Sequence, residues 1–181
     1  MRNQPVDTTA KSTHDSFMTH ACSAIGNEFL RKAQAEGRPL THMHLQKLIY
    51  IAHGWNLAVN NEPLVDEQFQ AWEFGPVSLS MYRALKMYGS GPVTRLIRHG
   101  DETPDKFDDD GDSIVAKLEQ YEKEIIDQIW EEFKEYKAFQ LSALTHKSNS
   151  PWDKAFKNGG QNTLIPNNDI QDYFSVLADA S

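Results

Sequence analysis

The sequence LQKLIYIAHGWNLAV, residues 45 to 59, decides the fold because its apolar residues recur at helical spacing. Thr41 stands just before it and is a good N-cap for a helix. One apolar stripe repeats at intervals of three and four residues, and further apolar residues extend the surface around the other side. The stripe consists of Leu45, Leu48, Ile49, Ala52, Trp55 and Val59. We therefore expect a helix that lies in the middle of the molecule.

Apolar residues with helical spacing also occur on both sides of this segment. The first pattern begins after Asp15 or Ser16, either of which can serve as N-cap, and ends near Gly37. Another begins at Pro76, because proline is favoured at the first helical position, and ends at Gly89. Between the central helix and this one, residues 60–63 indicate a turn, and residues 67–72 indicate a short strand or an extended loop.

The longest predicted helix follows in the second half of the chain. Its apolar residues alternate at four and three from Ile114 to Tyr136, over about six turns. We expect a break near Lys137 and then a short helix through Leu141 and Leu144.

Two further helices complete the chain. Ser150 as N-cap and Pro151 at the first helical position begin one helix, and the glycine pair 159–160 stops it. Asn167 or Asn168 caps the last one. The predicted fold class is mainly α: a compact single-domain bundle of six or seven mostly short helices with at most a minor short β element.

The chain is expected to form one domain, because 181 residues correspond to one domain of ordinary size. Residues 1–14 show no periodicity and are predicted to be a flexible lead-in, and residues 15–178 are predicted to be the helical domain. Residues 99–112 are predicted to be an exposed acidic loop, since DETPDKFDDDGD at 101–112 holds seven acids and one lysine.

Composition and charge limit the kinds of partner that we expect this protein to bind. No apolar run approaches the roughly 20 residues that a membrane span requires, and the first 25 residues lack the features of a signal peptide, so we expect a cytoplasmic protein without a membrane partner. Eighteen basic and 26 acidic residues give a net charge of −8, which disfavours binding to nucleic acid. A small basic cluster could attract a phosphate or acidic partner, but a solvated face is the simpler interpretation; it consists of Arg83, Lys86, Arg95 and Arg98.

The sequence lacks the motifs of the common enzyme classes. It has no phosphate-binding loop, no dinucleotide-binding glycine pattern and no nucleophile elbow. A calcium loop with Gly111 at its sixth position would place Lys106 and Lys117 where carboxylates are needed. We therefore predict a protein that is not an enzyme and has no cofactor.

Histidines in the central helix are not spaced as metal ligands. His42 and His44 point to different sides of a helix, and His42 and His53 share a face but lie roughly 16 Å apart along it. One ion cannot be held across that separation. No metal site is expected, and the histidines are interpreted as polar or interfacial groups.

Two short segments combine aromatic residues with glycine or proline. The first, AWEFGPV at residues 71–77, is predicted to form a rigid elbow and is followed by Tyr82. The second, LTHKSNSPW at residues 144–152, places polar groups between two helices beside Trp152. Each segment is compatible with a packed corner or with part of a groove for a partner protein.

Four segments in order resemble the Panacea domain antitoxins, which include the SocA-like proteolytic adaptor. LQKLIYIAHGWNLAV is similar to the leading helix motif of that family, and residues 62–64 with AWEFGPV and Tyr82 are similar to its central elbow. LTHKSNSPWDKAF at residues 144–156 is similar to the third signature, and residues 165–174 to the closing helix. Their order and spacing agree from about residue 24 to residue 174.

The resemblance implies an antitoxin of a toxin–antitoxin system, of a kind often carried on bacterial mobile elements or phages, that neutralises a cognate protein toxin by direct binding. The alternative that it implies is a proteolytic adaptor that delivers the bound toxin to an ATP-dependent cytosolic protease. The acidic loop could then steer a basic toxin toward the protein. The predicted partner-binding residues are Gln46, Lys47, Trp72, Phe74, Gly75, Pro76, Tyr82, Thr145, His146 and Trp152.

Overall fold

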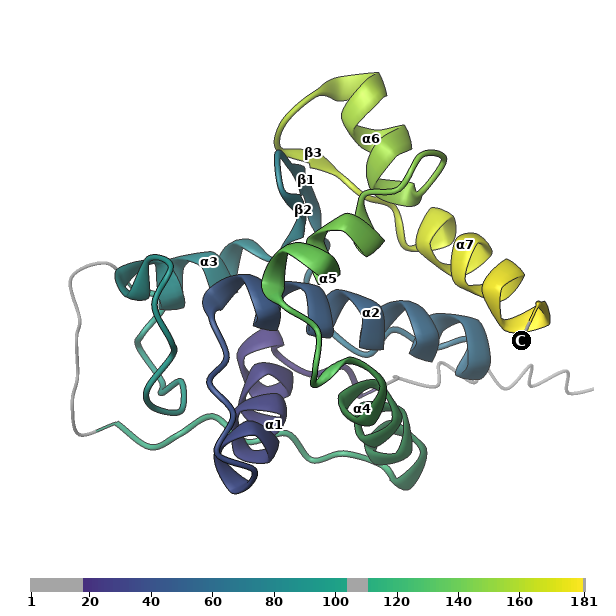
Figure 1. The fold of residues 1–181 in the computed structure, drawn as a ribbon. Helices are drawn as coiled ribbons and strands as arrows, with labels where there is room; N and C mark the ends of the chain where they lie inside the picture. The colour runs from purple at the N-terminus through teal and green to yellow at the C-terminus, as the bar shows by residue number, and fades with distance from the viewer. Residues whose placement is uncertain (1–17, 104–110, 181) are drawn as a thin grey trace, which may run out of the picture.

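The predicted central helix is present and organises the molecule. The computed structural model describes residues 18–103 and 111–180. In it, helix α2 (His42–Asn60) runs through the middle, and the other elements pack around it (Figure 1). Thr41 caps the helix as predicted: its hydroxyl accepts a hydrogen bond from His44 N, and its own N–H donates to His44 Nδ1 at 3.1 Å. Asn61, with a φ of 57°, ends the helix.

Two helices pack on one side of α2. They are α1 (Cys22–Ala35) and α4 (Gln120–Phe133), which lie below α2 in Figure 1. The indole of Trp130 on α4 is buried and donates to Glu36 Oε1, just after α1, at 2.7 Å. Helix α3 (Leu79–Leu85) contacts both α1 and α2, and a short 3₁₀ helix, Lys86–Tyr88, follows it and ends at Gly89.

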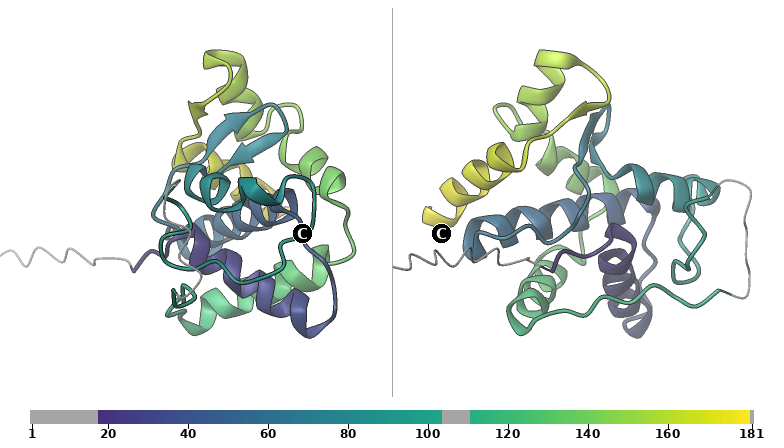
Figure 2. Two further views of the ribbon diagram at one scale, coloured as in Figure 1. Left: turned by 90° about the vertical axis from the view of Figure 1, so that its left-hand side faces the viewer. Right: turned by 180° about the vertical axis from the view of Figure 1, so that it is seen from behind.

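The opposite side of α2 is covered by the later part of the chain. Helices α5 (Ala138–Thr145), α6 (Pro151–Gly159) and α7 (Asn167–Asp179) lie there together with a small sheet (Figure 2). Strands β1 (Gln70–Trp72), β2 (Gly75–Val77) and β3 (Thr163–Leu164) are antiparallel in the order β2-β1-β3. The mainly α fold with one minor β element is confirmed, and of the two alternatives for residues 67–72, a short strand or an extended loop, the strand is present as β1.

Several predicted helix ends are also confirmed. Lys137 is the N-cap of α5, and Ser150 is the N-cap of α6, where its hydroxyl accepts a hydrogen bond from Asp153 N. Pro151 occupies the first position of α6, and the glycines 159 and 160 end the helix. The last helix begins one or two residues earlier than predicted, because Pro166 rather than Asn167 or Asn168 occupies the N-cap position of α7.

The first predicted helix begins too early. It starts at Cys22 rather than after Asp15 or Ser16, which lie outside the described residues. The segment just before it is extended, because His20 forms a parallel bridge with Val65 and its N–H donates to Leu64 O at 3.0 Å. A partner more than 40 positions away therefore overrides the local helical pattern.

The longest predicted helix is also wrong at its start. Residues 114–119 are extended, α4 begins only at Gln120, and α2 rather than α4 is the longest helix. The amide of Asn27 explains this, because its Nδ2 donates to both Ile97 O and Ile114 O at 2.8 Å. Ile114 N also donates to Ile97 O at 3.0 Å. These bonds hold the segment against α1 as an extended strap.

Pro76 does not begin a helix. It lies in β2, paired with Ala71 of β1, and α3 begins three residues later with Ser78 as its N-cap. Proline fits this strand position because it requires no donated ladder bond when the N–H side is not used. The elbow, residues 71–77, is therefore a β-hairpin.

The acidic segment is described only at its ends. Residues 104–110 lie outside the described parts of the chain, as does the lead-in of residues 1–14. Arg98 and Ser113 form an isolated antiparallel bridge, and Asp101 accepts two hydrogen bonds from Arg95. No helix within the described residues is long and apolar enough to cross a membrane.

Helix α7 packs against α2 at Gly54, where the ring of Phe174 takes the space of a side chain. A Cβ at this position would lie 2.3 Å from the Phe174 ring, which also contacts Tyr50 and Trp55 with ring centroids 6.0 and 5.7 Å apart. We predict that Gly54→Ala lowers the free energy of unfolding by about 1 to 3 kcal/mol, because the ring must move away from α2. Urea denaturation followed by tryptophan fluorescence measures the change.

Gly26→Ala is the matched control for that substitution. Gly26 also lies within a helix, but its added methyl would meet the flexible end of Met81, at 2.8 Å. The loss of stability should be smaller than for Gly54→Ala. Equal losses would mean that the contact with Phe174 does not decide the cost.

His53 links three segments in the core and is held neutral. It is completely buried, its Nδ1 accepts a hydrogen bond from Val65 N at 3.3 Å, and its Nε2 lies 3.0 Å from Asn167 Oδ1. Burial lowers its pKa from 6.5 to about 4. A second proton would have to occupy Nδ1, where the N–H of Val65 already points.

Stability should therefore fall as the pH drops from about 6.5 to about 4. In this window the unfolded chain protonates His53 and the folded chain does not, so the unfolded state is favoured. We expect this residue to contribute on the order of 2 kcal/mol to the loss. His53→Gln should be less stable at pH 7 but should lose less stability between pH 7 and pH 4. Parallel pH profiles for the two proteins would contradict this assignment.

Candidate partner-binding groove

The elbow is held in place by side chains from three helices. Alternate carbonyl groups of the hairpin each accept a hydrogen bond from a different helix, α6, α5 or α2 in turn. The bonds are Trp152 Nε1 to Trp72 O at 2.7 Å, Ser142 Oγ to Phe74 O at 2.7 Å and Lys47 Nζ to Pro76 O at 2.8 Å. The hairpin is thus attached to the helical layer along its whole length.

Gly75 allows the hairpin to lie this close to the helices. Its φ of 105° is a conformation that residues with side chains rarely adopt. A Cβ here would also lie 2.9 Å from Thr145 Oγ1 and 3.0 Å from Lys47 Nζ. The turn therefore requires glycine both for its backbone angle and for the space above α2 and α5.

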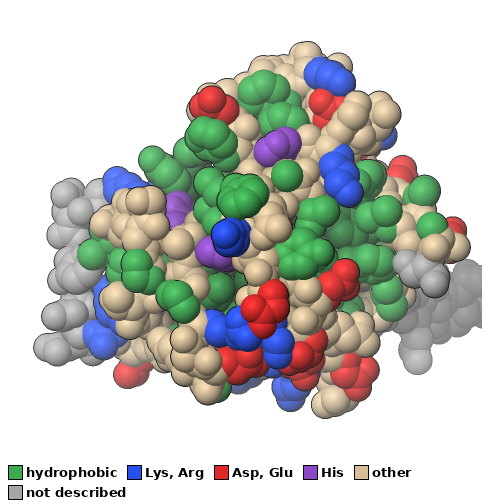
Figure 3. All heavy atoms as spheres, viewed as in Figure 1, with side chains coloured by type: hydrophobic (Ala, Val, Ile, Leu, Met, Phe, Trp, Pro, Cys, Tyr) green, Lys and Arg blue, Asp and Glu red, His purple; other side chains and the backbone are tan. Residues whose placement is uncertain are grey.

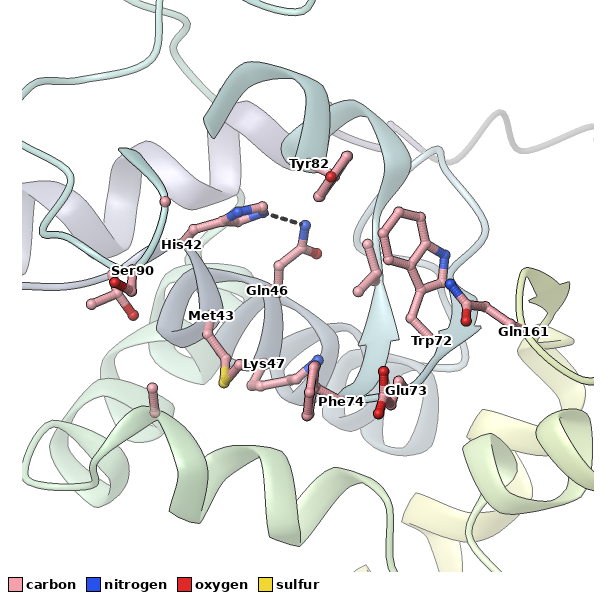
Figure 4. Close-up of a pocket in the computed structure, with 14 residues that line it drawn as sticks. His42, Met43, Gln46, Lys47, Trp72, Glu73, Phe74, Tyr82, Ser90 and Gln161 are labelled. Atoms are coloured by element: carbon pink, nitrogen blue, oxygen red, sulfur yellow. Dashed lines mark hydrogen bonds between the residues drawn. The ribbon is translucent and has the colours of Figure 1, made fainter. Parts of the chain in front are cut away.

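A groove of about 550 Å³ lies on the outer side of the elbow (Figure 4). We call it the elbow groove. Its walls come from the start of α2, the hairpin, α3 and the first residue of α5, with Gly89 and Ser90 from one loop and Gln161 from another. The lining residues are Thr41, His42, Met43, Gln46, Lys47, Trp72, Glu73, Phe74, Val77, Tyr82, Gly89, Ser90, Ala138 and Gln161.

Aromatic rings dominate one wall of the elbow groove. The ring of Tyr82 lies between those of Trp72 and His42, with centroid distances of 4.8 and 5.7 Å. Phe74 has 59% of its surface exposed, and Tyr82 has 37%. Figure 3 shows hydrophobic side chains and histidines gathered in the middle of the molecule, above a region rich in charged groups. These rings are available to a partner.

Gln46 positions the floor of the groove and has few donors left for a ligand. Its Oε1 accepts a hydrogen bond from Ser78 N at 2.7 Å, and its Nε2 donates to Ser78 O at 3.0 Å. The same Nε2 lies 3.0 Å from Nε2 of His42. The amide thereby fixes both the end of β2 and the imidazole that borders Tyr82.

Lys47 is the unusual member of the groove. Only 1% of its surface is exposed, and its ammonium group donates to Pro76 O. Within the described parts of the chain, it forms no ion pair with an Asp or Glu. Burial lowers its pKa from 10.5 to about 7. Burial also lowers the pKa values of His42 and His146, and the charge of Lys47 lowers both further.

The predicted partner-binding residues fall into two groups. Gln46, Lys47, Trp72, Phe74 and Tyr82 line the elbow groove. Those that lie outside its lining are Gly75, Pro76, Thr145, His146 and Trp152.

In the second group, Gly75 and Pro76 belong to the hairpin itself, and the other three residues support it from behind. Thr145 is buried under Gly75, and the ring of Trp152 packs between those of His146 and Phe156, with centroid distances of 5.1 and 4.9 Å. The indole N–H of Trp152 donates a hydrogen bond to the carbonyl of Trp72.

Sequence reasoning missed several members of the groove. His42 could have been found, because it stands four residues before Gln46 and so shares its helix face. Ser90 and Gln161 carry no such signal, because they reach the groove from loops remote in sequence. Among the described residues, no three His, Cys, Asp or Glu side chains are grouped so that they could hold a metal ion.

Comparison with known proteins connects these features to one family. The family model for the SocA-like antitoxin, Panacea domain, matches residues 45–153, which include most of the elbow groove and all three helix donors to the elbow. Antitoxin SocA of Caulobacter vibrioides strain NA1000 / CB15N is 34% identical over 144 residues, which cover 77% of this chain and 72% of that protein. No solved structure matches the chain. The chain therefore belongs to the SocA-like, Panacea domain family of antitoxins.

Proposed function

We propose that this protein is the antitoxin of a toxin–antitoxin system and that it neutralises its cognate toxin by direct binding through the elbow groove. The observation that carries the proposal is the exposed ring of Phe74 on a hairpin whose carbonyls are fixed by three helices, with the exposed ring of Tyr82 on α3 beside it. The relationship to antitoxin SocA supports the same role. A regulatory protein of this kind acts by contact and needs no chemistry of its own.

Rigid aromatic side chains are suited to such binding. A few aromatic residues at the centre of an interface commonly supply most of its binding free energy. Phe74 and Tyr82 are exposed, Ser142 holds the carbonyl of Phe74, and the backbone of Tyr82 lies within α3. Little conformational entropy is therefore lost when a toxin docks against them.

The charge of the protein favours a basic toxin. The net charge of −8 attracts a positively charged surface over long range and raises the association rate more than the final affinity. We propose the cytoplasm as the setting of this encounter.

Phe74→Asp should abolish neutralisation. We expect the variant to bind the toxin at least about 30-fold more weakly, because a hot-spot ring contributes about 2 kcal/mol or more. Since Phe74 is exposed, the fold should remain intact. Growth rescue in cells that co-express the cognate toxin, together with titration calorimetry, measures the effect.

Val176→Asp is the matched control, because Val176 is 69% exposed on α7 and lines no part of the elbow groove. It should rescue growth as well as the unchanged protein does. Full rescue by Phe74→Asp would refute the role of the groove.

The lifetime of the toxin separates occlusion from delivery to a protease. If the antitoxin acts by binding alone, the half-life of the toxin after translation is stopped should be the same with and without the antitoxin. A half-life that becomes several-fold shorter in the presence of the antitoxin, and that recovers in cells lacking the ATP-dependent protease, would instead support the adaptor role. Pulse-chase labelling of the toxin provides the measurement.

A further inference from the structure

Support of the hairpin does not by itself require the buried ammonium group of Lys47. One hydrogen bond to Pro76 O holds the strand, and a neutral amide can do the same work. The next residue toward the N-terminus shows this, because Gln46 holds Ser78 through both its amide atoms. A lysine at position 47 adds a charge that must be taken out of water at a considerable cost.

No interaction among the described residues offsets the free energy lost when this charge is removed from water. A buried cation is normally stabilised by an ion pair or by several hydrogen bonds. Lys47 has one carbonyl acceptor and no carboxylate partner there, although an ammonium group has three hydrogen atoms to donate. The neighbouring groups that could carry charge include the imidazoles of His42 and His146, whose positive forms would repel it. The site is therefore complementary to an anion.

Lys47 also lines the elbow groove, and with 1% of its surface exposed it lies just beneath the surface of the groove. In Figure 4 its amine lies beside Phe74, between the floor of the groove and the hairpin. The surrounding rings of Trp72 and Tyr82 offer apolar contact next to this single charge. The combination suits a short segment that carries an apolar residue adjacent to an acidic one.

We propose that the elbow groove receives a side-chain carboxylate, from an Asp or Glu flanked by an apolar residue of the toxin, and that this carboxylate pairs with Lys47 Nζ. The inference rests on the proposed function, because it names the chemistry of the toxin segment that occupies the groove. Once the segment is bound, the carboxylate completes the buried ion pair, and the apolar neighbour covers it against the aromatic wall.

Glu73 at the edge of the groove opposes an acidic ligand, but only weakly. Its side chain is exposed, where water and salt screen its charge. Lys47 is buried, where screening is small. The attraction therefore outweighs the repulsion.

Binding of a carboxylate should favour the protonated form of Lys47. The other titratable groups that line the groove with it are His42 on α2, Glu73 in the hairpin turn and Tyr82 on α3, and His146 after α5 senses its charge. The lowered pKa values of His42 and His146 keep these imidazoles neutral above pH 6.5. With the pKa of Lys47 at about 7, the affinity for a carboxylate should fall by up to roughly 20-fold from pH 6.5 to pH 8.5.

Three tripeptides test the proposal without the toxin. The first is acetylated and amidated and has a glutamate between two phenylalanines, the second has glutamine in place of the glutamate, and the third is the glutamine peptide with a free C-terminal carboxylate. Binding to the full chain is measured by NMR titration at pH 6.5. We expect the glutamate peptide to bind with a millimolar dissociation constant and at least 10-fold more tightly than either of the others, and to weaken at pH 8.5.

Two variants connect this preference to one side chain. Lys47→Met keeps most of the buried stem and should remove the preference for glutamate, whereas Lys147→Met, which removes an exposed lysine outside the groove, should keep it. If Lys47→Met does not fold, the comparison of the three peptides on the unchanged protein still tests whether the groove selects a carboxylate.

Each other outcome overturns the inference. Equal binding of all three peptides, or no binding in the millimolar range, would mean that the groove does not select a carboxylate. Tightest binding by the peptide with the free C-terminus would mean that it selects a chain end. Because no toxin is used, these failures are distinct from a failure of Phe74→Asp to impair neutralisation, which would count against the proposed function itself.

Discussion

Three hydrogen bonds from side chains to the backbone of one short hairpin attach it to the central helix and to two of the helices that cover one side of that helix. The donors are Lys47 on α2, Ser142 on α5 and Trp152 on α6, and the acceptors are alternate carbonyls of the elbow. A two-stranded hairpin of this length has little stability of its own in water. The helices therefore determine its conformation, and they thereby position the exposed ring of Phe74 in the turn.

The central helix supplies both the core and the binding surface. Its middle and C-terminal turns are buried between α7 and α4, and Gly54 leaves room there for the Phe174 ring of α7. Its first two turns carry His42, Gln46 and Lys47 into the elbow groove. A single rigid element thus couples the stability of the fold to the geometry of the groove, and a change in the core that tilts α2 also moves the groove.

The sequence correctly predicts those helices that are determined by interactions between residues close together in the chain. Helix α2 and the start of α6 follow from apolar spacing and from caps at Thr41 and Ser150, which act within a few residues. The late start of α1 and the extended strap before α4 depend instead on bonds to Leu64 and Asn27, which no local pattern reveals. For the groove, spacing and resemblance identify the aromatic elbow and α2. They do not separate the residues that line the groove from those behind it, because that division depends on how the hairpin folds over α5 and α6.

The smallest strand has a consequence for the timing of assembly. β3 pairs with β1 across about half of the chain, at Gln70↔Leu164 and Ala71↔Thr163, and Asn162 N donates to Ala71 O at 2.8 Å. During synthesis on the ribosome, the earlier strands emerge long before this third one. A growing chain therefore cannot close its sheet until nearly all of it has been translated, and a fragment that ends before residue 160 would carry the aromatic rings without their full support.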